Sequence, residues 1–122
     1  MAKLVASVDV LSGGRLIFGA AVGWMQGEFD ALGVPPKERA SRTDEALQLI
    51  RALWTQEYPE IRTDRHHLEG VQASPMPLQK PHPLIWIGGN SEAPLRRAAR
   101  LGDGWHEIHP AFPGIEGQHA AD

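Results

Sequence analysis

The stretch that most constrains the fold is residues 83–106, PLIWIGGNSEAPLRRAARLGDGWH. It predicts a short apolar strand, a paired-glycine turn, a helix that begins after Ser91, and a second strand. A strand that passes through glycines into a helix brings backbone N–H groups and the positive end of the helix dipole together. The stretch therefore indicates an α/β fold with a site for a phosphate-bearing ligand at the turn.

The rest of the chain alternates in the same way. Apolar periodicity predicts helices over residues 2–11, 25–32 and 37–55, a strand buried on both faces over residues 15–22, and a second buried strand over 84–87. Residues 58–83 are rich in proline and predict an extended excursion that includes a small hairpin around Asp64 and Arg65. In the last helix, Leu95, Ala98, Ala99 and Leu101 are expected to face inward, and Arg96, Arg97 and Arg100 outward. This order favours parallel strands joined by crossover helices.

Composition limits the possible functions. The chain has 122 residues, a net charge of −3 and no cysteine, so we expect one domain, no disulfide or thiolate metal site, and no nucleic-acid surface. It has no apolar run of about 18 residues, so we expect no membrane span. Its first residues lack the pattern of a secretory signal, so the expected location is cytoplasmic. The histidines do not have the spacing of a zinc helix, so no metal site is predicted; they include His66, His67, His82, His106 and His109.

Three motifs, in order, resemble the luciferase-like monooxygenase family of FMN- or coenzyme F-420-dependent oxidoreductases. They are LSGGRLIFGAAVGWMQGEFDALGVP at 11–35, ERASRTDEALQLIRALWT at 38–55 and KPHPLIWIGGNSEAPLRRAARLGDGWH at 80–106. The family usually has a Gly-x-Gly-x-Gly-Trp run at the end of the first of these strands. This chain has Gly19, Ala21 and Gly23 before Trp24, so the middle glycine is missing.

The resemblance implies the fold class α/β, a partial TIM-type (β/α)8 barrel. About three parallel strands with crossover helices and a Pro-rich excursion would form a single domain over residues 1–122, with a frayed tail at 108–122. A complete barrel of this type needs about 250 residues. The chain therefore resembles only the stretch from the third helix to about the sixth strand, and the strands that carry much of the family's catalytic pocket have no counterpart.

The resemblance also implies a cofactor site. The Ile87, Gly88, Gly89 and Asn90 backbone would hold the phosphate of FMN or of the deazaflavin coenzyme F-420, and Gly23 and Trp24 would form a wall of the pocket. Without the resemblance, the glycines favour an ordinary tight turn over a phosphate site, and Trp24 fits a packed side chain as well as a pocket wall. No catalytic residue can be assigned, because the sequence spacing assembles no catalytic triad or carboxylate pair.

The implied function is that of a flavin- or deazaflavin-dependent oxidoreductase or monooxygenase acting on a small-molecule substrate. The alternative is a catalytically inactive truncated fragment or an oligomerising half-barrel. Half a barrel exposes strand edges and an apolar face, so we expect a homo-oligomer or a complementing chain.

Overall fold

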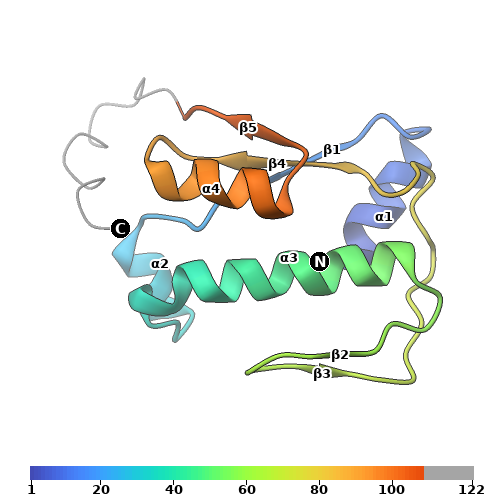
Figure 1. Ribbon diagram of the computed structural model, residues 1–122, viewed down its shortest axis with the longest axis horizontal. Helices are drawn as coiled ribbons and strands as arrows, with labels where there is room; N and C mark the ends of the chain where they lie inside the picture. The colour runs from blue at the N-terminus through green and yellow to red at the C-terminus, as the bar shows by residue number, and fades with distance from the viewer. Residues whose placement is uncertain (109–122) are drawn as a thin grey trace. The chain divides into compact units, whose positions relative to one another are not determined.

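The computed structural model describes residues 1–108; most of the tail predicted to fray, residues 109–122, lies outside the described residues. The predicted order of elements is confirmed (Figure 1). The elements are α1 (Ala2–Leu11), β1 (Ile17–Ala20), α2 (Gln26–Ala31), the 3-10 helix η1 (Pro36–Glu38), α3 (Arg39–Thr55), β2 (Ile61–Arg62), β3 (His67–Leu68), β4 (Leu84–Gly88), α4 (Glu92–Leu101) and β5 (Gly104–His106). None of the helices in this part of the chain is long and apolar enough to cross a bilayer.

The strands form two sheets. A three-stranded parallel sheet has the order β1-β4-β5, with Trp86 opposite Gly104 and Gly88 opposite His106. Since β1 neighbours a strand that comes much later in the chain, the intervening helices and excursion act as crossovers. The predicted hairpin is confirmed as a separate antiparallel pair, β2 with β3.

The residues group into two compact units. One contains residues 1–18 and 45–84, and the other contains residues 19–44 and the described residues from 85 onward. Each unit has its own buried centre, and all pockets described below are lined by residues of the second unit alone.

Trp54 is the centre of the first unit. It is 1% exposed, and its ring packs edge-on against Phe18 at a centroid distance of 5.7 Å. Its indole Nε1 donates a hydrogen bond of 3.0 Å to the carbonyl of Ala2. An indole needs such an acceptor when it is buried. One side chain of α3 therefore fixes both the start of α1 and strand β1.

Asp9 is the second anchor of this unit, and it is fully buried. Gln79 donates to it twice, from the backbone N–H at 2.9 Å and from the side-chain amide at 2.7 Å. The same amide of Gln79 donates to the carbonyl of Leu16. The last turn of α1, the Pro-rich excursion and the approach to β1 are thereby joined by one carboxylate.

The prediction that two strands are buried on both faces is wrong. In β1, Ile17 is 47% exposed, and in β4 the side chains alternate. Ile85 and Ile87 are buried, whereas Leu84 and Trp86 are 45% and 38% exposed. Neighbouring residues of a strand point to opposite faces. Only one face of these strands is covered by the described residues.

The assignment of faces on α4 also needs correction. Arg97, expected outside, is 6% exposed, while Leu95, expected inside, is 45% exposed; Ala99 is exposed as well. The buried stripe instead follows Pro94 and Arg97 at a spacing of three residues. A charge is buried there because it has a carboxylate partner, which the helix's own sequence does not reveal.

Asp9 makes stability depend on pH. Burial raises the pKa of the Asp9 carboxyl, but the hydrogen bonds of the Gln79 backbone and side chain oppose it. Further hydrogen bonds of the Leu78 and Leu16 backbones act in the same sense, and together they hold this pKa below its ordinary value. A lowered pKa stabilises the fold fully at neutral pH, and this contribution is lost as pH falls below about 4 toward the folded-state pKa.

We expect Asp9→Asn to lower the free energy of unfolding by about 1–3 kcal/mol at pH 7, because the buried donors lose a charged acceptor. The loss should shrink at acidic pH. Urea denaturation across a pH series measures this, with Asp64→Asn in the exposed hairpin turn as the control. A loss of stability in Asp9→Asn that is the same at every pH would contradict the assignment.

Candidate functional site

A pocket of about 80 Å³ lies where the turn after β4 meets the segment after β1. Five of the six predicted cofactor residues line it: Gly23, Trp24, Gly88, Gly89 and Asn90. Segments far apart in the sequence are thus brought to one place, at the carboxyl ends of their strands. In barrel enzymes of this kind ligands bind at that end.

Ile87 is the predicted residue that does not line the pocket. It is 1% exposed, and its side chain lies against the end of α4, where a Cβ added to Gly102 would approach Ile87 Cγ1 at 2.9 Å. Ile87 therefore contributes to packing and positions the turn that follows it.

The two glycines of the turn have different roles. Gly89 has φ +143°, and a Cβ there would lie 2.4 Å from Cγ of Pro94, so a side chain is excluded. At Gly88 an added Cβ would make ordinary van der Waals contacts with Ile108 at 3.5 Å and Ala21 at 3.7 Å, so glycine is not needed there to avoid a clash.

The turn is held by strand β5 and the residues after it. The Gly89 N–H donates to the His106 carbonyl at 3.2 Å, and the Gly89 carbonyl accepts from the Trp105 indole at 2.7 Å. The Asn90 side chain both donates to the Ile108 carbonyl and accepts from its N–H. The Gly89 N–H and the Asn90 amide are therefore engaged within the protein and do not face an anion.

The first turn of α4 supplies the remaining donors. The N–H groups at a helix start have no acceptor within the helix, and they carry the positive end of its dipole. Ser91 occupies the N-cap position, and the helix begins at Glu92. Pro94 has no N–H, so Glu92 and Ala93 carry the donors of this turn.

Arg39 is a site residue that the sequence analysis missed. This half-buried first residue of α3 lines the same pocket. It also lines an adjoining cavity of about 370 Å³, together with Val22, Lys37 and Arg97. The sequence offered one signal for Arg39, since a cation stands in the first turn of a helix soon after a Pro-Pro pair. Only the fold brings this cation to the glycine turn.

An ion-pair cluster fixes α4 against α3. Asp44 of α3 accepts from Arg97 Nε at 2.5 Å and from Arg100 Nη2 at 2.7 Å. The Arg97 side chain is 7% exposed, so this pair is largely removed from water. Because Asp44 lies on the same helix as Arg39, the cluster sets where the start of α4 stands relative to that cation.

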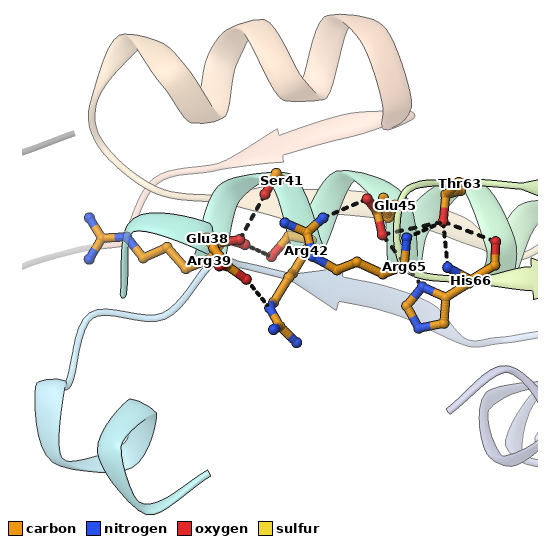
Figure 2. A network of polar contacts seen from close by, with 9 residues as sticks. Glu38, Arg39, Ser41, Arg42, Glu45, Thr63, Arg65 and His66 are labelled. Atoms are coloured by element: carbon orange, nitrogen blue, oxygen red, sulfur yellow. Dashed lines mark hydrogen bonds and ion pairs between the residues drawn. The ribbon is translucent and has the colours of Figure 1, made fainter. Parts of the chain in front are cut away.

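A second polar cluster, shown in Figure 2, is structural. Glu45 Oε1 accepts a hydrogen bond from Arg65 Nη1 at 2.6 Å, and Glu45 also contacts Thr63 and His66 of the β2–β3 turn. Glu45 fastens the hairpin to α3. Glu45, Thr63, Arg65 and His66 line neither pocket, whereas Arg39, which Figure 2 also draws, lines both. The described residues hold no group of three or more His, Asp or Glu arranged to bind a metal ion.

The pocket at the turn fits the phosphate end of a cofactor. Its volume is about 80 Å³, and much of its lining consists of small residues, namely Ala21, Gly23, Gly88 and Gly89. The charge is appropriate too, because the Arg39 guanidinium and the α4 N-terminus both favour an anion. The described residues thus place a cation and a helix N-terminus around one small pocket.

The comparison with known families decides the relationship. The chain matches the luciferase-like monooxygenase family over residues 1–120. It belongs to that family. Its fold is accordingly part of the family's TIM-type barrel.

Individual relatives agree. The chain is 34% identical over 120 residues to an FMNH(2)-dependent dimethylsulfone monooxygenase of Pseudomonas putida, covering 96% of this chain and 33% of the relative. It is 34% identical over 105 residues to an uncharacterized protein of Mycobacterium tuberculosis, covering 86% of this chain and 35% of that protein. The chain therefore spans about a third of the length of these curated relatives.

Solved structures give the same picture. The monooxygenase RslO1 from Streptomyces bottropensis superposes with a TM-score of 0.78 at 31% identity, over 85% of this chain and 32% of that one. An F420-dependent secondary alcohol dehydrogenase superposes with a TM-score of 0.75 at 21% identity, over 87% of this chain and 32% of that one, a likeness of fold alone.

We expect Gly89→Ala to destabilise the second unit by about 2 kcal/mol or more, because the added methyl meets Pro94 and the backbone is strained. Gly19→Ala on β1 is the matched control, since nothing lies within 4 Å of its added Cβ. Chemical denaturation of both variants compares them. Equal stability of the two variants would rule out a requirement for glycine at the turn.

Proposed function

We propose that this chain is part of a flavin- or deazaflavin-dependent oxidoreductase of the luciferase-like family, and that the pocket at the Gly88–Gly89 turn holds the cofactor phosphate. One observation carries the proposal: Gly23, Trp24, Gly88, Gly89 and Asn90 line one pocket together with Arg39. Family membership supports the choice of FMN or coenzyme F-420 as the ligand. The single partial barrel domain and the cytoplasmic location stay predictions.

Each element of the pocket has a part in binding. Arg39 and the N–H groups at the start of α4 neutralise the phosphate, and Gly88 lets it approach the backbone of the turn. Trp24 and Val22 supply an apolar wall that limits access of water. Reduced FMN, when bound, would supply the two electrons with which O2 gives one oxygen atom to a small-molecule substrate and the other to water; a reduced deazaflavin would supply a hydride to such a substrate. The residues of this chain anchor and orient the cofactor.

The test is a titration of the full chain with FMN and with coenzyme F-420, followed by absorbance and fluorescence. Binding should perturb the spectrum of the cofactor. Gly88→Ala should weaken the affinity for the cofactor roughly tenfold, because the added methyl group lines the pocket without a clash inside the protein. Gly19→Ala is the control and should bind like the unaltered chain. No spectral change at millimolar ligand would refute the proposal.

A second proposal concerns the uncovered side of the sheet. Leu84 and Trp86 lie on the same face of β4 and are 45% and 38% exposed, and His106 of β5 lies on that face against Trp86. Exposed apolar residues grouped on one face of a sheet are typical of an interface. We propose that another copy of this chain, or a chain that supplies more of the barrel, covers them. The alternative to an active enzyme is a catalytically inactive fragment of the barrel.

Sedimentation velocity tests whether the chain self-associates. The chain should sediment as a species heavier than its 13.4 kDa monomer, and Trp86→Lys should shift it toward the monomer. Leu78→Lys, at a residue that is 55% exposed outside the sheet, is the control and should leave association unchanged. A compact monomer at all concentrations would exclude self-association and leave only a different chain as the partner.

A further inference from the structure

The ends of three neighbouring strands form one side of the pocket at the Gly88–Gly89 turn. The sheet has the order β1-β4-β5; Ala21 directly follows β1, Gly88 ends β4, and Ile108 comes shortly after β5. All three residues line the pocket. The middle position carries no side chain, so a space remains over Gly88 between the side chains of Ala21 and Ile108, here called the Gly88 gap.

The Gly88 gap is one atom wide. A carbon atom at the Cβ position of Gly88 would lie 3.5 Å from Ile108 Cδ1 and 3.7 Å from Ala21 Cβ. Carbon atoms in contact are separated by about 3.5–4.0 Å, so one atom at this point already touches both side chains. A branched group of a ligand would have to displace one of them.

The two sides of the gap differ in how far they can yield. Ile108 is 39% exposed, and its side chain has rotatable bonds through which it can move aside. The methyl group of Ala21 is attached directly to the backbone and has no other rotamer. Ala21 is also exposed, so its methyl group borders the pocket rather than the protein core. Ala21 is therefore the fixed boundary of the gap.

The gap selects by size and not by charge. Its flanking atoms are carbons, which donate no hydrogen bond, and a charged oxygen that loses water without gaining a donor is strongly disfavoured. The charged groups of the pocket are Arg39 and the first turn of α4, where an anion is favoured. The atom that enters the gap is accordingly uncharged.

We propose that Ala21 is a specificity-determining residue of this pocket. Its methyl group sets the width of the Gly88 gap, which admits a single unbranched, uncharged atom of the bound cofactor beside the phosphate. The inference rests on the proposed function. It adds that side chains at positions 21 and 88 compete for one space, so that a methyl group added at one position is compensated by a methyl group removed at the other.

The experiment measures the dissociation constants of the full chain for FMN and for coenzyme F-420 by fluorescence titration. Ala21→Val should weaken binding roughly tenfold, because the larger side chain closes the gap. This loss should be the same at low and high salt, since it involves no charge and salt screens only charged contacts. Gly19→Ala, two residues earlier on the same strand, is the control and should bind like the unaltered chain, because nothing lies within 4 Å of its added Cβ.

The double variant Ala21→Gly with Gly88→Ala is the decisive measurement. It moves the methyl group from one side of the gap to the other, and it should recover most of the affinity that Gly88→Ala loses alone, as coupled neighbouring positions do. Circular dichroism checks that each variant keeps its fold.

The outcomes distinguish this inference from the proposed function. Unchanged affinity in Ala21→Val, or a double variant that binds as weakly as Gly88→Ala, would overturn the role of Ala21 and leave the phosphate pocket in place. If Ala21→Val does not fold, the double variant still decides. Failure of both cofactors to bind the unaltered chain would overturn the phosphate pocket, and the role of Ala21 with it.

Discussion

The buried pairing of Asp44 with Arg97 is the constraint on which the candidate site depends. It joins α3, which begins with Arg39, to α4, whose first turn offers N–H groups to an anion. A buried ion pair adds little net stability compared with apolar packing, yet removal of one partner costs about 3–5 kcal/mol. The contribution of this ion pair is to position the two helices. It places a cation and a helix N-terminus around the same two pockets, and it neutralises Arg97 where water does not reach.

The glycine turn contributes shape more than it contributes donors. Its Gly89 N–H and the Asn90 side chain bind β5 and the residue that follows, so they stabilise the turn itself. Besides the turn, the pocket is lined by Gly88, by the start of α4 and by Arg39. The phosphate site proposed above depends on small residues at one spot and on charges that arrive from other elements.

Family membership and chain length together explain the uneven burial of the sheet. The chain corresponds to about a third of its relatives, and it matches them with TM-scores of 0.78 and 0.75 over most of its own length. The covered side of β4 is buried to 0–1% at Ile85 and Ile87, while Leu84 and Trp86 of the other side remain exposed. In a parallel barrel both faces of each strand are covered. The local fold of the described residues is thus that of part of a family barrel.

The sequence by itself determined the order of elements, the hairpin, the parallel arrangement and the turn that requires glycine. Periodicity, glycine and proline are local signals, and the covalent chain carries them directly. The motifs also indicated the family and five residues that share one pocket. Only the tertiary structure decided that Arg39 belongs there, that Arg97 is buried and Leu95 exposed, and that Ile87 packs away from the pocket. Those outcomes depend on which distant group each side chain meets, such as the carboxylate of Asp44, and a helical pattern read along one segment contains no record of that partner.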